Sequence, residues 1–285
     1  MIHPNYTNYH SHSLYCDGRA DMESFVRSAI SEGFSSYGFS SHAPLPFPTR
    51  WTMEWERMDD YLAEFAQLKK KYEKDLELAV GLEIDYLDDE NNPSNIRFRR
   101  LPLDYRIGSV HLLQDKEKNV VDIDCAPDRF CQLVDEHFDG DLESVVRQYY
   151  AHLFRMIELG GFDILGHADK MHYNASCYRP GLLDETWYKE LMTKYLDIIA
   201  QSGCQVEINT KSYLKLQTFY PNERYFPALH SLGIRVQVNS DSHFPERINA
   251  GRMEAFEALV RAGYKTVMEW HGGEWVAVPI SCLSR

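Results

Sequence analysis

The chain has 285 residues and a formal net charge of −13 at pH 7, and 44% of its residues are hydrophobic. This length suits one α/β barrel with a large buried core, so we expect a single domain over residues 1–285. The acidic balance argues against a nucleic-acid partner, because duplex binders need a face rich in Lys and Arg. The cysteines are scattered, and neither a signal segment nor a run of about 18 apolar residues occurs, so we expect a cytoplasmic protein with no membrane partner.

Short apolar segments rich in β-forming residues alternate with amphipathic segments along the chain. Strands are predicted at 6–10, 34–40, 76–86, 105–111, 162–166, 205–209, 235–239 and 266–270. Helices are predicted at 21–32, 53–74, 142–159, 184–202 and 250–262, where apolar residues recur three and four positions apart. The polar stretch 87–100 is predicted to be a solvated loop. Repeated βα units of this kind predict a parallel sheet with helices outside it.

Metal-binding residue types recur where the predicted strands end. In a parallel barrel, the carboxyl ends of the strands and the loops after them form the active face. Six side chains lie at or just past such an end: His10, Glu83, His111, His167, Glu207 and Asp241. Histidines that serve only packing would not all collect at one end of a barrel, so the pattern predicts a functional site there.

Two short motifs and one buried carboxylate indicate metal binding. His10 and His12 lie on one face of an extended segment, about 6.6 Å apart along the backbone, so both imidazoles can converge on one ion. Asp241 and His243 repeat this spacing with a carboxylate in the first position. Glu83 lies in an otherwise apolar strand, where it must be paired or bind a metal to offset its desolvation. The full set exceeds what one ion can bind and predicts a metal cluster: His10, His12, Asp17, His42, Glu83, His111, His167, Asp241 and His243.

Six segments in order resemble the successive motifs of the polymerase-and-histidinol-phosphatase (PHP) superfamily. They are YHSHSLYCDG (9–18), FSSHAP (39–44), GLE (81–83), GSVH (108–111), ILGHAD (164–169) and SDSH (240–243). Within the superfamily, the chain is most similar to the monofunctional histidinol-phosphate phosphatases, because of Asp17, of His42 followed by Ala43 and Pro44, and of the segment 108–111. The resemblance implies a distorted, TIM-like (β/α)₇ barrel that carries three divalent metal ions.

The resemblance also assigns ligands and an activity. It places His10, His12, Glu83 and Asp241 on the first metal, with Glu83 bridging to a second metal held by His111 and His167, and Asp17, His42 and His243 on the third. Imidazole and carboxylate ligands without thiolate suit Zn, Mn or Fe. The implied reaction is hydrolysis of L-histidinol phosphate to L-histidinol and phosphate, in histidine biosynthesis, by a metal-activated hydroxide. The residues expected to act closest to the reaction are Glu83, Asp17 and His243.

A phosphomonoester site also needs cations for the phosphoryl oxygens. Arg179 and Lys215 are candidates because both follow predicted strands on the active face, although both also fit ordinary solvated charges. Glu207 is a candidate partner for the ammonium or imidazole of the substrate, or else a brace for the barrel. Related enzymes often carry Ser-Gly after Asn-Thr, whereas this chain has Lys211 and Ser212 at that place.

Two other classes of function stay open at this point. One is a PHP-type phosphoesterase that acts on another small phosphomonoester or on a nucleotide, including a nuclease of the proofreading type, which the acidic balance disfavours. The other is a non-catalytic metal-binding scaffold, which would carry degraded ligand positions, whereas this chain has the complete set. The chain has neither a GxSxG nor a GxxxxGK[ST] motif, so serine nucleophiles and nucleotide-driven chemistry lack support.

Overall fold

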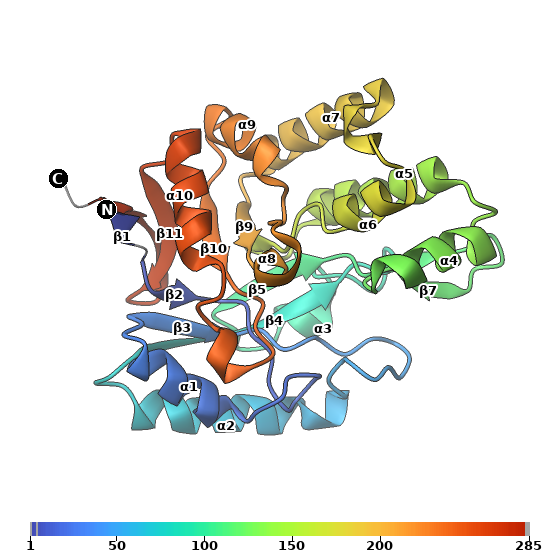
Figure 1. Ribbon diagram of the computed structural model, residues 1–285. Coiled ribbons are helices and arrows are strands. Elements are labelled where there is room, and N and C mark those ends of the chain that lie inside the picture. Colours follow the sequence, from blue (N-terminus) through green and yellow to red (C-terminus); the bar gives the residue numbers. More distant parts are fainter. Residues whose placement is uncertain (1, 4, 283–285) are drawn as a thin grey trace.

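The computed structural model describes residues 2–3 and 5–282, and a parallel sheet of seven strands forms its centre (Figure 1). The strands are β2 (Thr7–Asn8), β3 (Ser36–Phe39), β4 (Glu77–Asp85), β5 (Tyr105–Ser109), β8 (Ile164–Leu165), β9 (Gln205–Asn209) and β10 (Val236–Asn239). Their order is β10-β9-β8-β5-β4-β3-β2, and every neighbouring pair is parallel. Since all strands run the same way, their carboxyl ends lie at one edge.

The two outer strands of this sheet approach each other along a seam. Asparagine side chains link them, because Asn8 Oδ1 accepts a hydrogen bond from the backbone N–H of Ser240 at 2.7 Å and Asn239 Oδ1 accepts one from Tyr9 at 2.8 Å. Beyond the strands, the backbone N–H of His12 donates to the carbonyl of Ser242 at 2.9 Å. The sheet is therefore a nearly closed barrel of seven parallel strands, which confirms the predicted distorted (β/α)₇ fold.

Helices cover the outside of the barrel (Figure 1). The long ones are α1 (Met22–Ser31), α2 (Met58–Lys71), α4 (Pro127–His137), α5 (Leu142–Leu159), α7 (Thr186–Ser202) and α10 (Arg252–Ala262). The shorter ones are α3 (Ile96–Arg99), α6 (Met171–Tyr178), α8 (Tyr213–Leu216) and α9 (Phe226–Ser231). The helix α1 starts at Asp21, whose side chain accepts a hydrogen bond from the Ser24 N–H at 2.7 Å, and it buries Met22, Phe25 and Val26. In the predicted helices, such as α1, the apolar spacing therefore marks the face that packs on the sheet.

The amino end of the barrel is filled by aromatic side chains. Tyr105 is fully buried, and its hydroxyl donates to the carbonyls of Tyr9 at 2.6 Å and Phe39 at 2.9 Å. Gly81 gives its ring room, since a Cβ there would lie 2.6 Å from Tyr105 Cε2. The hairpin of β11 (Thr266–His271) and β12 (Glu274–Pro279) adds Trp275, whose ring centroid lies 4.9 Å from that of Tyr9. This end of the barrel is packed, and the carboxyl ends of the strands are left to build a site.

The structure differs from the predicted elements in several places. The predicted strand 266–270 exists, but it pairs antiparallel with β12 outside the barrel. The predicted loop 87–100 contains the short helix α3, which Asn95 caps by accepting a hydrogen bond from the Arg97 N–H. Helices α4 and α6 and the hairpin of β6 (Leu112–Gln114) with β7 (Val120–Asp122) were not predicted. No helix in the described part of the chain has the length and apolar character needed to cross a membrane.

Candidate metal centre

The nine predicted ligand side chains meet at the carboxyl end of the barrel, and we call this set the cage. They come from the segments after β2, β3, β5, β8 and β10 and from β4 itself. Seven of them are buried, and only the last two in this list are half-buried: His10, His12, His42, Glu83, His111, His167, Asp241, Asp17 and His243. Side chains separated by up to about 230 residues in sequence thus share one site, which the parallel strands of the barrel bring about.

Glu83 lies at the centre of the cage. Its Oε2 atom is 3.1 Å from His10 Nε2 and 2.9 Å from His42 Nδ1, and its Oε1 atom is 2.8 Å from His167 Nε2. The Nε2 atoms of His111 and His167 are 3.1 Å apart. One carboxylate therefore faces imidazoles on both sides, which is the geometry that a ligand shared by two ions requires.

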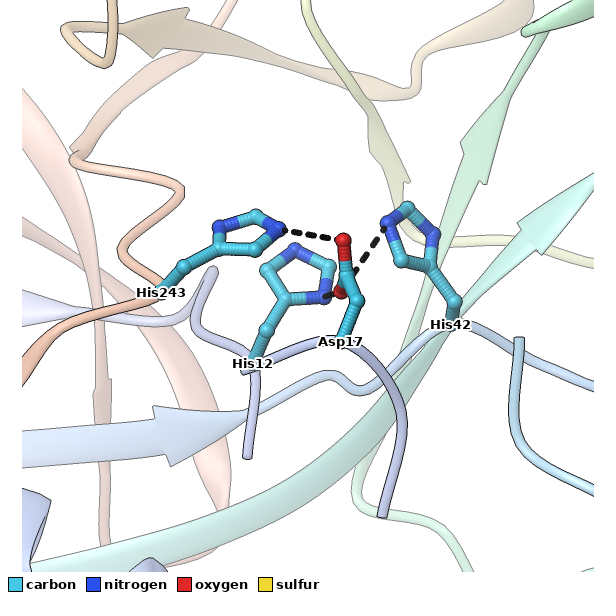
Figure 2. Close-up of side chains that lie close together, drawn as sticks. All are labelled: His12, Asp17, His42 and His243. Carbon is cyan, nitrogen blue, oxygen red and sulfur yellow. Dashed lines mark ion pairs between the residues drawn. The ribbon is translucent and has the colours of Figure 1, made fainter. Parts of the chain in front are cut away.

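Asp17 lies among three histidines of the cage (Figure 2). Figure 2 shows the imidazoles of His12, His42 and His243 around its carboxylate. Asp17 Oδ2 is 3.2 Å from His243 Nε2, while Asp17 Oδ1 is 3.9 Å from both His12 Nδ1 and His42 Nε2. These separations leave room for an ion between the donors, because each donor would sit about 2.0–2.2 Å from a bound Zn²⁺.

Asp241 joins the cage across the barrel seam. Its Oδ1 atom is 3.1 Å from His12 Nε2 and 3.1 Å from Lys211 Nζ. Asp241 has a backbone φ of 46° and His167 has a φ of 25°, a region that residues other than glycine rarely adopt. Backbone strain of this kind persists where the surrounding structure imposes it, typically at functional sites.

Two buried carboxylates orient the histidines from behind. Glu207 Oε1 lies 2.7 Å from His10 Nδ1, and Asp85 Oδ1 lies 2.8 Å from His111 Nδ1. A carboxylate at Nδ1 fixes the tautomer, so that Nε2 of each ring presents its lone pair to the cage. The other oxygen of Glu207 accepts hydrogen bonds from the His167 backbone N–H at 2.8 Å and the Asn209 amide at 3.0 Å. Both oxygens of Glu207 are thus engaged with the protein, which matches the brace that the sequence left open as an alternative.

The polar atoms of the cage fit divalent metal ions. His10 Nε2, His12 Nε2, Glu83 Oε2 and Asp17 Oδ1 are buried without a hydrogen-bond partner in the described chain, an arrangement that is costly unless an ion satisfies it. In each of three groups of residues, the ligand atoms lie within 4.8 Å of one another. The groups are His12, Asp17, His42 and His243; His10, His12 and Glu83; and His42, Glu83 and His111. The overlap of these groups at shared residues is what adjacent ions would need.

The electrostatics of the cage keep its carboxylates ionised. Burial raises the pKa of Glu83, but His10, His42 and His111 outweigh this effect and hold that pKa well below its usual range. The pKa of Asp241 is also lowered, because Lys211 and His10 outweigh its burial. Ionised carboxylates are the form that binds metal, so these two side chains need not lose a proton before a cation binds.

Two adjoining cavities open beside the cage. The first, which we call the mouth, has a volume of about 130 Å³ and is lined by Asp17, His42, Trp51, His111, Asp122, Asp124, Lys211 and His243. The second, which we call the side cavity, has a volume of about 220 Å³, and it shares Asp124 and Lys211 with the mouth. The cage therefore faces a small binding space rather than a broad groove.

The candidate substrate-binding residues lie in different places. Lys215 lines the side cavity. Arg179 ends helix α6 and pairs with Glu185 at 3.5 Å, and it is not among the described residues that line either cavity. Sequence reasoning did not select Lys211, which lines both cavities and contacts Asp241. Its departure from the Ser-Gly pair common after Asn-Thr is the sequence signal that could have identified it.

Comparisons with known proteins agree with this geometry. Residues 8–211 match the family described as PHP domain. Probable histidinol-phosphatases of Deinococcus radiodurans and Schizosaccharomyces pombe are 27% and 25% identical to the chain, covering 92% and 89% of it and 95% and 86% of their own length. The crystal structure of histidinol phosphate phosphatase from Lactococcus lactis, complexed with Zn, L-histidinol and phosphate, superposes with a TM-score of 0.74 at 20% identity, over 95% of this chain and 99% of that one. This last likeness shows a shared fold.

Proposed function

Since the chain belongs to the PHP domain family, we propose that it is a metal-dependent phosphomonoesterase that hydrolyses L-histidinol phosphate to L-histidinol and phosphate. The observation that carries the proposal is the cage itself, in which one buried carboxylate, Glu83, lies within 3.1 Å of imidazoles from three different parts of the barrel. The names of relatives that cover about nine-tenths of the chain support the choice of substrate. The proposed phosphoesterase barrel extends over residues 1–285, because Asp241 and His243 lie beyond the matched segment.

We propose three divalent ions, Zn, Mn or Fe, in the cage. His10, His12, Glu83 and Asp241 would hold the first; Glu83, His111 and His167 the second; and Asp17, His42 and His243 the third. The ions supply Lewis acidity, which stabilises the charge of phosphoryl transfer. Glu83, Asp17 and His243 are the proposed residues nearest the reaction, and the last two also line the mouth.

The residues of the mouth would bind and orient the phosphoryl group. Lys211 Nζ offers a cation at the boundary between the mouth and the side cavity, held 3.1 Å from Asp241. Trp51 packs edge-on against His42, with ring centroids 4.7 Å apart, and covers one side of the mouth with an apolar surface. Such a wall limits the water that reaches the phosphoryl group, which strengthens its contact with Lys211.

The organic part of L-histidinol phosphate carries a primary amine, which needs a carboxylate partner when protonated. Asp122 and Asp124 line the mouth, and Asp122 faces this group in the proposal, because Asp124 is already paired with Lys170. Burial raises the pKa of Asp122, and the nearby Asp124 raises it further. An ammonium group beside Asp122 would stabilise its ionised form. The roles of Arg179, Lys215 and Glu207 in substrate binding, and a cytoplasmic location, stay predictions from the sequence.

Removal and return of metal tests the proposed function. We expect purified protein to release phosphate from L-histidinol phosphate, to lose this activity after chelation, and to regain it with Mn²⁺ or Zn²⁺. Elemental analysis of the same samples should show that activity follows bound metal. Fully metallated protein that leaves L-histidinol phosphate intact would reject the proposal.

A further inference from the structure

Three lysines surround the side cavity in a chain whose net charge is −13. Lys170, Lys211 and Lys215 come from three successive parts of the active face: the segment after β8, the segment after β9, and helix α8. Asp124 is the only carboxylate among the described residues that line this cavity. The cavity therefore has a local excess of positive charge, opposite in sign to the molecule as a whole.

The lysine nearest the cavity carboxylate is fixed and neutralised. Lys170 Nζ lies 2.5 Å from Asp124 Oδ2, and only 13% of the Lys170 side chain is exposed. Lys170 therefore neutralises Asp124, the one carboxylate among the described lining residues of the cavity. Lys211 is shared with Asp241 in the cage, whereas Lys215 forms no ion pair with any described residue. At least one ammonium group is thus left to face a ligand.

Neutral donors complete the polar side of the cavity. The hydroxyls of Ser212 and Tyr220 lie 3.4 Å apart on its wall, and Tyr220 is 5% exposed. Burial raises the pKa of Tyr220 to about 12, so its hydroxyl keeps its proton and can donate a hydrogen bond. The lining also includes the apolar side chains of Val110, Ile123 and Met171. Lysines, hydroxyls and apolar side chains are what a small ligand with an anionic end requires.

The side cavity and the mouth adjoin, because Asp124 and Lys211 line both. A small molecule whose phosphoryl group lies in the mouth would therefore extend its other end into the side cavity. The volume of about 220 Å³ suits a short chain and is small for a nucleoside.

We propose that the side cavity binds a second anionic group of a small phosphomonoester, either a carboxylate or another phosphoryl group, so that acidic phosphomonoesters form a further substrate class of this enzyme. The inference rests on the proposed phosphatase function and goes beyond L-histidinol phosphate, whose organic part is cationic. The reaction stays a hydrolysis. Water forms the new bond to phosphorus, the ester P–O bond breaks, and the alcohol leaves with the proton and with its anionic end unchanged.

Binding of phosphonates, which carry a P–C bond and are not hydrolysed, tests the proposal without turnover. We would compare 4-phosphonobutyrate and butylphosphonate by calorimetry on the metal-reconstituted protein. The carboxylate should lower the Kd about tenfold relative to the methyl end. Equal affinity of the two ligands, or tighter binding of butylphosphonate, would overturn the proposal.

Variants of Lys215 locate the effect. Its side chain is exposed and unpaired within the described chain, so substitution should leave the fold intact. In Lys215→Met, the ratio of the Kd values for the methyl-ended and carboxylate-ended ligands should fall towards one, and Lys215→Glu should favour the methyl-ended ligand. Lys70→Met, on the exposed side of α2, removes the same charge elsewhere and should keep the tenfold ratio. The same ratio loss in Lys70→Met would mean that overall charge, and not the side cavity, sets the preference.

Turnover separates this inference from the proposed function. The metallated enzyme would be assayed with L-histidinol phosphate, 3-phosphoglycerate and glycerol 3-phosphate. Hydrolysis of all three, with kcat/KM about tenfold higher for 3-phosphoglycerate than for glycerol 3-phosphate, supports both proposals. Hydrolysis of L-histidinol phosphate without this advantage overturns the side-cavity proposal alone. Failure with L-histidinol phosphate but preferential hydrolysis of 3-phosphoglycerate overturns the proposed substrate and keeps the inference.

Discussion

The cage and the side cavity lie next to each other but differ in the burial of their charged residues and in the elements that carry them. The cage residues follow barrel strands, are mostly buried, and are held from behind by buried carboxylates such as Glu207 and Asp85. The side cavity is lined by loops and by helix residues, among them those of the short helices α6 and α8, and its lysines are partly exposed. In a buried site an unpaired charge is costly, so the cage is constrained to bind cations. Exposed lysines carry no such constraint, so the side cavity is free to set substrate preference while the chemistry of the cage stays fixed.

The largest effect is expected at the centre of the cage. Glu83→Ala removes the carboxylate that faces His10, His42 and His167, so we expect loss of bound metal and a fall in kcat/KM of about 1000-fold or more. Glu77→Ala removes a carboxylate from the amino end of the same strand and should keep full metal content. Elemental analysis and a phosphate-release assay measure both. Three ions per chain in Glu83→Ala would refute its bridging role.

A smaller effect is expected one layer behind the cage. Glu207→Gln keeps the volume of the side chain but removes the charge that fixes the His10 ring at 2.7 Å. Metal affinity should fall about 10- to 100-fold, the usual effect of losing such a partner. Asp85→Asn should act alike through His111. Competition with a metal-binding dye gives the affinities. If Glu207 instead binds substrate, Glu207→Gln would raise KM at unchanged metal affinity.

The next effect distinguishes Lys211 from Arg179 as the cation that binds the phosphoryl group. Lys211→Met removes the ammonium group shared by the mouth and the side cavity, so kcat/KM for any phosphomonoester should fall about tenfold. Arg179→Met removes a guanidinium that pairs with Glu185, and its effect should stay within about twofold. Steady-state kinetics at saturating metal measures both. A tenfold loss in Arg179→Met would favour the assignment made from sequence.

The smallest effect concerns salt. Dissolved ions screen exposed charges over about 8–10 Å near physiological ionic strength, whereas buried pairs are screened much less. Raising NaCl should therefore weaken the preference for 4-phosphonobutyrate over butylphosphonate about threefold, while bound metal stays constant. Calorimetry at low and high salt, with elemental analysis of each sample, checks this. If NaCl instead removed metal and left the preference for 4-phosphonobutyrate unchanged, the cage and not the side cavity would be the salt-sensitive region.

The same contrast explains how much of the molecule the sequence predicted. The parallel sheet and the convergence of side chains at its carboxyl end followed from strand periodicity and from residue types at strand ends, because parallel strands bring those ends together. The distorted barrel and the assignment of the nine cage side chains to three ions came from the resemblance to the PHP superfamily. The connecting elements were harder: α4, α6 and the β6–β7 hairpin lie in long excursions whose course depends on tertiary packing. Lys170 and Asp124 are 46 residues apart and meet only through these excursions, so no local pattern could assign them to one cavity.

The seam of the barrel has a consequence for how the enzyme is made. Asn8 and Asn239 close the barrel between its first and last strands, and His12 and Asp241 meet across that line. A chain still emerging from the ribosome can form the inner strands, but it lacks one wall of the cage until the segment with Asp241 and His243 is released. Ions that bridge the two edges would then bind only after the segment that carries Asp241 and His243 has been synthesised, so the cage is assembled late in translation.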